Sequence, residues 1–248
     1  MEWRGWSSKL SGTLGLAQEP VAVAFAGALP EGAAPPSGRL SVCQALRQAR
    51  EGACITLTAD TCGCPGGLMN LGLGRLSPEG QERLADFLIR RERVYSSRVA
   101  LHRSQQTLAP PLGLASHVCF APLSAATFRP DLVIFLDRPG SLHRLIGLAD
   151  YWEGGALTTD LAGPACRAGI TYPLATGNLG LSLLDFGARK LAGFAEDLLL
   201  ISVPFHRMIG IMHALDDTSA RPEAPAGTFE REVEALGPPE KAHSQGMS

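Results

Sequence analysis

The stretch Pro130-Asp-Leu-Val-Ile-Phe-Leu136, followed by Pro139, decides the fold class. Its unbroken apolar run, 132–136, predicts a buried strand. Pro139 suits the first turn of a helix, and apolar residues recur after it at helical spacing: Leu142, Leu145, Ile146, Ala149 and Trp152. A buried strand followed by an amphipathic helix is typical of folds that layer helices on a sheet. We therefore predict an α/β fold, with a mixed α+β fold as the open alternative.

The same patterns extend outward along the chain. Further strands are expected at 21–25, 54–58, 117–121 and 198–203, and further helices at 3–17, 41–50 and 205–215 and from Ser77 onward. Ser41 and Ser77 are placed to cap their helices. The segments 62–74 and 163–180, both rich in glycine, are expected to be loops.

Composition excludes several classes of protein. Of the 248 residues, 45% are apolar and 19% are charged, which rules out a wholly disordered chain. The formal charge of -2 argues against a general nucleic-acid binder, which needs a basic excess. The N-terminal residues lack a signal-peptide pattern, and the apolar run 21–29 is shorter than the about 20 residues that span a bilayer. We expect a cytoplasmic protein with no membrane or nucleic-acid partner.

Landmarks recur in the same order in the two halves of the chain. Each half has a proline before a strand, then a helix, then Glu-Gly, an aspartate and Asn-Leu-Gly-Leu: Pro20, Glu51, Asp60 and Asn70 in the first half, and Pro130, Glu153, Asp160 and Asn178 in the second. The order predicts two pseudo-duplicated α/β halves packed as one compact domain. The expected boundaries are 1–18 for an N-terminal helix or arm, 19–126 and 127–216 for the halves, and 217–248 for a disordered tail.

The cysteines are the most informative chemical feature of the sequence. Cys62-Gly-Cys64-Pro-Gly-Gly67 sets two thiols in a glycine-rich loop, where they can ligate a soft metal or part of an iron–sulfur cluster. The chain has no second closely spaced pair of cysteines. Further ligands must therefore come from distant parts of the sequence, and Cys43 and Cys166 are the candidates. Cys54 and Cys119 lie inside predicted strands and are expected to be buried structural residues. For the others, simple burial stays an alternative.

Matched polar residues offer further candidates for ligand binding. Asp60 and Asp160 follow the Thr-containing segments of the two halves, where they either form turns and helix caps or bind a ligand. Asn70 and Asn178 have the same two interpretations. None of the six histidines forms a metal-spaced pair, and no phosphate-loop, serine-hydrolase or zinc-protease motif is present.

Several of these motifs together resemble one family. They are Arg39-Leu-Ser-Val-Cys-Gln-Ala, Cys62 with Gly66-Gly67, Ala121-Pro-Leu123, Pro130–Phe135, Cys166 and Asn178-Leu-Gly180. The chain is similar over about residues 14–215 to the DUF169 (ArCR) family of bacterial and archaeal proteins. The resemblance carries no settled activity, but it draws attention to Cys43 and to a cysteine in the 62–64 loop.

Three functions remain open at this stage. The first is a cysteine-lined cleft that binds a metal ion or an iron–sulfur cluster, with Cys43, Cys62, Cys64 and Cys166 as ligands. The second is a small-molecule binding module with structural cysteines, in which Asp60, Asn70, Asp160 and Asn178 contact the ligand. The third is a thiol-dependent enzyme that uses Cys62 or Cys64. Assembly into a homo-oligomer also stays open.

Overall fold

A single antiparallel sheet forms the centre of the protein. The structure, a computed structural model, describes residues 3–105, 113, 115–161, 163–220 and 227–237. Within these residues six strands are ordered β2-β3-β1-β4-β6-β5, and each neighbouring pair is antiparallel. The strands are β1 (Val21–Ala26), β2 (Ile55–Leu57), β3 (His117–Pro122), β4 (Leu132–Asp137), β5 (Gly180–Ser182) and β6 (Leu199–Pro204). The mixed class of α and β structure is confirmed.

Helices connect and cover these strands. The α-helices are α1 (Trp3–Leu14), α2 (Val42–Arg50), α3 (Pro65–Asn70), α4 (Pro78–Asp86), α5 (Arg98–Gln105), α6 (Pro139–Asp150), α7 (Tyr172–Thr176), α8 (Phe205–Ala220) and α9 (Thr228–Ala235). Short π-helical turns occur at η1 (Phe87–Arg91), η2 (Arg167–Thr171) and η3 (Gly187–Leu191). No helix in the described ranges is both long and apolar enough to cross a bilayer.

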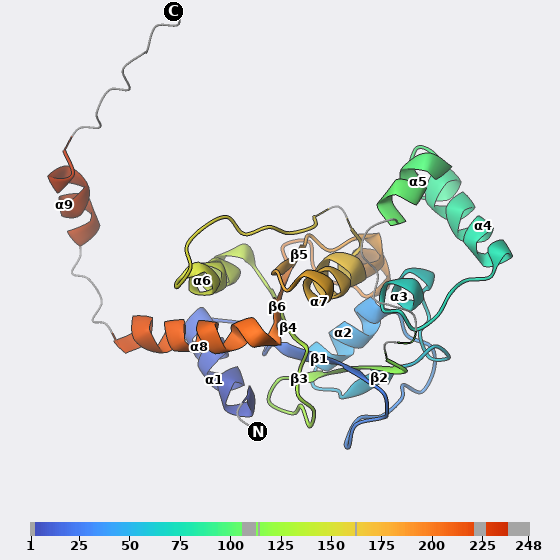
Figure 1. Ribbon diagram of the computed structural model, residues 1–248, viewed down its shortest axis with the longest axis horizontal. Coiled ribbons are helices and arrows are strands. Elements are labelled where there is room, and N and C mark those ends of the chain that lie inside the picture. The colour runs from blue at the N-terminus through green and yellow to red at the C-terminus, as the bar shows by residue number, and fades with distance from the viewer. Residues whose placement is uncertain (1–2, 106–112, 114, 162, 221–226, 238–248) are drawn as a thin grey trace, which may run out of the picture.

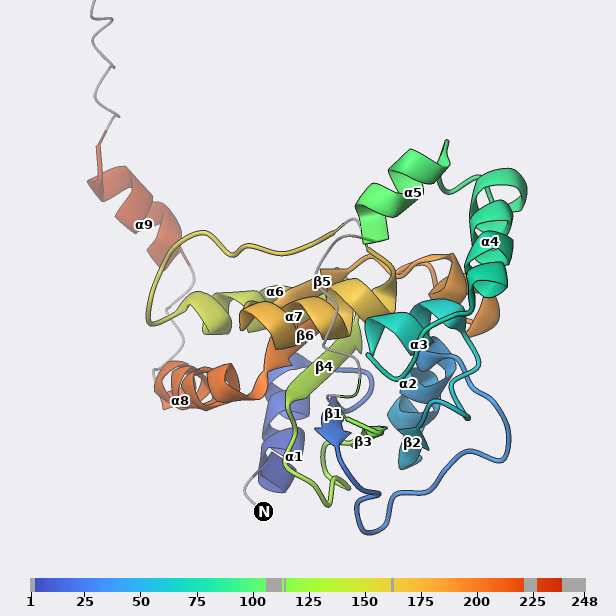
Figure 2. The same ribbon diagram turned by 45° about the vertical axis from the view of Figure 1, so that its right-hand side comes forward.

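The alternation of side chains along the strands divides the core into two faces. On β4, Leu132 and Ile134 pack on one face with α2, whereas Val133 and Phe135 pack on the other with α6 and α8. We call these the α2 face and the α8 face. Figures 1 and 2 show α1 close to α8, on the side away from α2 and α3. Both faces of the sheet are therefore covered, and the segments that carry Cys43, Cys62, Cys64 and Cys166 gather on the α2 face.

The predicted duplication is not confirmed. The strand order has a symmetric form, because β2-β3-β1 in the first half meets β4-β6-β5 in the second. However, α2 follows β1 on one face of the sheet, whereas α6 follows β4 on the opposite face. A pseudo-twofold relation that superimposes β1 on β4 would leave both helices on the same face. The equivalence of the two halves therefore stays a prediction.

The ends of several elements differ from the predictions. Pro65–Asn70, expected within a loop, forms α3, and 163–180 contains η2, α7 and the start of β5. At the C-terminal end, α8 continues to Ala220, and α9 lies within the expected tail. The remaining parts of that tail, 221–226 and 238–248, lie outside the described residues.

Ser41 caps α2 in the predicted way. Its side chain accepts a hydrogen bond from the Gln44 backbone N–H at 3.1 Å, and the Gln44 side chain accepts one from the Ser41 N–H at 2.9 Å. This reciprocal capping box satisfies two backbone donors that the first turn of a helix otherwise leaves unpaired. The cap fixes the start of α2, where Val42 and Cys43 enter the core.

Replacing Ser41 with alanine is expected to lower the free energy of unfolding by about 1 kcal/mol, because the cap hydrogen bond is lost. Urea denaturation followed by circular dichroism measures the change. Ser41→Thr keeps a capping hydroxyl and is the matched control. Equal unfolding midpoints for Ser41→Ala and Ser41→Thr would contradict this account of the cap.

Candidate functional site

Four of the six cysteines meet on the α2 face from separate parts of the chain. Cys43 is the second residue of α2, Cys62 lies in the turn after β2, and Cys64 is the N-cap of α3. Cys166 comes directly before η2. Cys43, Cys62 and Cys166 belong to one buried cluster, and Cys64 packs against it partly exposed. We call these four residues the cysteine cluster.

Cys64 is the thiol of the cluster whose pKa is lowered. Its sulfur accepts a hydrogen bond from the Gly67 N–H at 3.2 Å. A hydrogen bond from the Cys62 thiol, together with those from the backbone N–H groups of Val42 and Gly67, lowers the pKa of Cys64 to about 6, although burial opposes the shift. Val42 and Gly67 lie in the first turns of α2 and α3, where unpaired N–H groups face outward and favour negative charge. These donors favour the thiolate form of Cys64.

Cys62 is the protonated neighbour of this thiolate. Its hydrogen bond to Cys64 and its burial both raise the pKa of Cys62. The thiol also lies 3.7 Å from the carbonyl oxygen of Cys64, and only 1% of the residue is exposed. The turn that carries it is fixed to the chain before α2, since the Leu40 N–H donates to Thr61 and the Gly63 N–H donates to Leu40. Cys62 and Cys64 thus form a thiol–thiolate pair.

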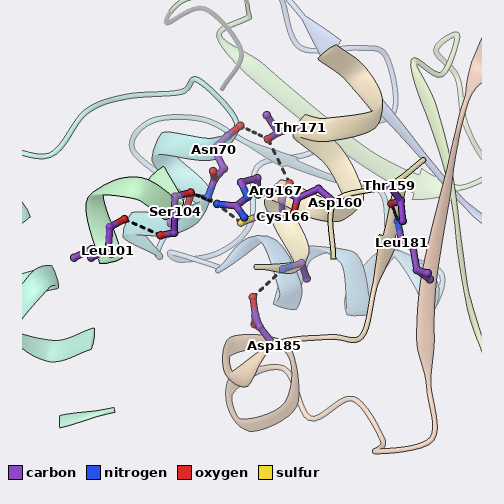
Figure 3. Close-up of polar contacts among 12 residues, drawn as sticks. Asn70, Leu101, Ser104, Thr159, Asp160, Cys166, Arg167, Thr171, Leu181 and Asp185 are labelled. Carbon is purple, nitrogen blue, oxygen red and sulfur yellow. Dashed lines mark hydrogen bonds and ion pairs between the residues drawn. The ribbon is translucent and has the colours of Figure 1, made fainter. Parts of the chain in front are cut away.

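Cys166 is linked to α3 through Asn70. The Asn70 side-chain amide lies 3.4 Å from the Cys166 sulfur and 2.8 Å from the Gly66 carbonyl oxygen, and it donates to both. The Thr171 hydroxyl donates to the Asn70 carbonyl oxygen (Figure 3). Burial raises the pKa of Cys166 to about 12, with further contributions from the negative charges of Cys64 and Asp185. The two glycine-rich segments, 62–74 and 163–180, are therefore in direct contact at this cysteine.

Cys43 is also buried in the same region. Burial raises the pKa of its thiol, and nearby Cys166, Asp185 and Cys64 raise it further. Because these electrostatic effects fall off with distance, they place Cys43 close to the other members of the cluster. Its neighbours along α2 are core residues such as Val42 and Leu46.

Asp185 is a site residue that the sequence analysis missed. One carboxylate oxygen accepts the Ala165 N–H at 2.8 Å, and the other accepts the Ala188 N–H at 2.9 Å. The first of these bonds fixes the residue directly before Cys166 (Figure 3). Asp185 follows Leu184, which is buried and has a φ of 62°, a left-handed conformation that is rare for a branched side chain. Such strain is often found beside functional groups.

The arginines beside the cluster are occupied by oxygen acceptors. Arg167 is 5% exposed, and it donates to Asp160 at 3.1 Å and to the Ser104 carbonyl oxygen of α5 (Figure 3). Arg39 donates to the Cys62 carbonyl oxygen at 2.9 Å. Among the ion pairs of the described residues, none involves Asp185. Arg39 and Arg167 therefore direct these donors to oxygen atoms rather than to the sulfurs of the cluster.

The other predicted ligand residues are not brought together. Asp160 pairs with Arg167, whereas Asp60 is exposed in the turn after β2, so the two aspartates are not equivalent. Asn70 reaches Cys166, but the backbone N–H of Asn178 bonds instead to the Thr176 hydroxyl. Of these four residues, it is Asn70 that donates a hydrogen bond to a cysteine of the cluster.

The remaining two cysteines lie away from the cluster. Cys119 is fully buried on β3 and points to the opposite face from its neighbours Val118 and Phe120, which pack on the α2 face. It accepts a hydrogen bond from the Thr56 hydroxyl at 3.4 Å. Cys54 packs against the core of the α8 face. The sheet therefore separates the cluster from these two thiols.

The gathered side chains do not form a closed coordination sphere. Across the residues that the structure describes, no group of three His, Cys, Asp or Glu side chains is arranged as a ready metal-ion site. All six cysteines are free thiols. The arrangement presents a thiolate, adjoining thiols and a carboxylate that a thiophilic group could draw together.

Comparison with known proteins identifies the family. The model of the DUF169 family, described as uncharacterised ArCR, matches residues 9–214 and therefore covers the sheet and all four cluster cysteines. No curated protein and no solved structure matches the chain. Because the family model spans most of the sequence, the chain belongs to the DUF169 family.

Proposed function

We propose that the cysteine cluster binds a soft metal ion or an iron–sulfur cluster through its thiolates, in a cytoplasmic protein. The observation that supports this most strongly is the convergence of Cys43, Cys62, Cys64 and Cys166 from separate segments onto one side of the sheet. Sulfur ligands select soft metals, and iron–sulfur clusters are held by sets of cysteine thiolates. The six free thiols fit the reducing conditions of the cytoplasm.

The local charge favours a cation as the ligand. A catalytic thiolate is usually paired with a positively charged side chain. Here the Cys64 sulfur accepts a hydrogen bond from the Gly67 N–H, Asp185 opposes its ionisation, and Arg39 and Arg167 donate to oxygen atoms. A bound cation would neutralise both negative groups and would allow Cys62 to lose its proton, as ligand thiols must.

The surroundings suit the binding of a sulfur-ligated group. Backbone N–H groups and the Asn70 amide donate to the sulfurs of Cys64 and Cys166, and such donors orient ligands and tune the group that they hold. The π-helical turn η2 begins directly after Cys166, and irregular turns of this kind are frequent at functional sites. Four sulfurs match the usual number of cysteine ligands for a cluster.

The proposal is tested on protein that is purified anaerobically and analysed for iron, acid-labile sulfide and other metals. Iron together with sulfide indicates a cluster, and a metal without sulfide indicates a single ion. The metal-free protein is then titrated with Cd²⁺, which gives a thiolate-to-metal absorption band. We expect tight Cd²⁺ binding. Cys64→Ser and Cys166→Ser should each weaken it by more than the loss of about 10- to 100-fold that is typical when a residue behind the direct ligands is replaced.

Cys119→Ser and Cys54→Ser are the matched controls, because these thiols lie on the far side of the sheet from the cluster. Both variants should keep the affinity of the unaltered protein. A protein that contains no metal when purified and gives no thiolate absorption with Cd²⁺ would refute the proposal. Equal losses in the control and cluster variants would show nonspecific thiol binding and would refute it as well.

A further inference from the structure

The Cys62–Cys64 pair has features beyond those of a ligand set. The two cysteines are separated by a single glycine, and the Cys62 thiol lies 3.7 Å from the Cys64 carbonyl oxygen. A Cβ atom built on Gly67 would lie 2.7 Å from the Cys64 sulfur and 3.3 Å from the Cys62 sulfur, so both sulfurs face the same glycine. The two sulfurs therefore lie close together on one side of Gly67.

The two sulfurs differ in access to solvent. Cys64 is partly exposed at the start of α3, whereas Cys62 is buried behind it. The Gly67 N–H donates to the Cys64 sulfur and favours its thiolate form. A partly exposed cysteine with a second thiol buried beside it is the arrangement of an attacking cysteine and a resolving cysteine.

We propose that Cys62 and Cys64 are a reversible redox pair that exchanges with low-molecular-weight disulfides, Cys64 attacking and Cys62 resolving. This activity does not depend on metal binding, because it needs only the two thiols and a disulfide as the oxidant. Cys166 and Cys43 take no part in it, since the sulfurs nearest to Gly67 are those of Cys62 and Cys64, and Cys166 is bonded to Asn70.

The exchange proceeds in two balanced steps. The Cys64 thiolate attacks one sulfur of the external disulfide, whose S–S bond breaks, and one thiolate leaves and takes up a proton from solvent. Cys62 then loses its proton to solvent and attacks the Cys64 sulfur of the mixed disulfide, which expels the second external thiolate. The second external thiolate then takes up a proton from solvent. In total, the Cys64 thiolate and the Cys62 thiol give up two electrons and one proton, and with one further proton from solvent the external disulfide becomes two thiols.

The experiment uses the full-length protein, reduced and treated with a chelator, and oxidised glutathione as the probe. After oxidation, the remaining thiols are alkylated and the protein is mapped by mass spectrometry. We expect one disulfide that joins Cys62 to Cys64, while the other four cysteines stay alkylated. Reduced glutathione in excess should restore both thiols.

Variants test which of the two cysteines attacks and which one resolves. Cys62→Ala should accumulate a stable glutathione adduct at Cys64, because no resolving thiol remains, and Cys64→Ser should form neither the adduct nor the disulfide. Cys54→Ser is the control and should leave the Cys62–Cys64 disulfide unchanged. Circular dichroism shows whether each variant is folded, and Cys62→Ser replaces Cys62→Ala if the latter is not.

The proposal fails if glutathione oxidises Cys54 while Cys62 and Cys64 both stay alkylated. It also fails if the folded Cys62 variant carries no glutathione at Cys64. Either result leaves metal binding to be judged by the Cd²⁺ titration alone, because that titration uses fully reduced protein. Conversely, a disulfide in a protein that does not bind Cd²⁺ would support the redox pair and refute the metal site.

Discussion

Replacing Gly67 with alanine is expected to disrupt the cysteine cluster and to weaken Cd²⁺ binding by more than about tenfold, as changes beside metal ligands do. The new Cβ atom would lie 2.5 Å from Val42 Cγ2 and 2.7 Å from the Cys64 sulfur, so α3 must move away from α2. That movement would lengthen the hydrogen bond from the Gly67 N–H to Cys64. Overpacking of this kind also costs about 1–3 kcal/mol in the free energy of unfolding.

Gly66 provides the matched control for this substitution. A Cβ atom at Gly66 would meet the Asn70 side-chain nitrogen at 3.9 Å, which is an ordinary contact. Gly66→Ala should therefore preserve Cd²⁺ binding and stabilise the protein by about 0.4–1 kcal/mol, since alanine restricts the unfolded chain. Cd²⁺ titration and urea denaturation measure both effects. Equal affinities for Gly66→Ala and Gly67→Ala would show that the close approach at Gly67 is unimportant.

The largest loss of stability is expected for Phe120→Ala, at about 4 kcal/mol. Phe120 is fully buried on β3, where it is paired with Val23 of β1 and with Ile55 of β2. Removing its ring leaves a cavity in the core of the α2 face, beneath the helix that carries Cys43. Because a typical domain has only about 5–15 kcal/mol of stability, the loss is a large fraction of the total.

Urea denaturation measures this loss, and Phe229→Ala is its control. Phe229 lies on α9 and is 77% exposed, so its removal should change the free energy of unfolding by no more than about 0.5 kcal/mol. A decrease below about 1 kcal/mol for Phe120→Ala would mean that the α2 face repacks around the missing ring.

Local patterns in the sequence were sufficient to predict most of the elements. Alternating or continuous apolar residues identified the strands at 21–25, 117–121 and 132–136, and the capping residues Ser41 and Ser77 identified two helix starts. These signals depend on residues close together in the chain. Strand pairing does not, and so the antiparallel order and the positions of α2 and α6 on opposite faces could not be derived.

Short or irregular elements were missed for identifiable reasons. The helix α3 contains Pro65, Gly66 and Gly67, which have low helix propensity, and it forms because Cys64 caps it and the fold packs it against α2. The strand β5 has three residues, too few to show a period of two. Tertiary contacts, rather than local preference, determine both elements.

The candidate site, too, could be predicted only in part from the sequence. The spacing of Cys62 and Cys64 and the glycine-rich loop drew attention to the pair, and the structure brings Cys43 and Cys166 into the same cluster. Asp185 had no such signal, because a single aspartate in an apolar segment carries no motif. Its orientation depends on the left-handed conformation of Leu184, a position where the sequence rules favour glycine or asparagine.

The short strands at the two ends of the sheet affect how copies of the protein meet in solution. β2 and β5 are the edge strands, and each has only three residues, so few unpaired backbone groups are exposed there to template another chain. Ala34 already bridges to Ile55 along the outer side of β2. Edge-to-edge pairing between copies is therefore disfavoured.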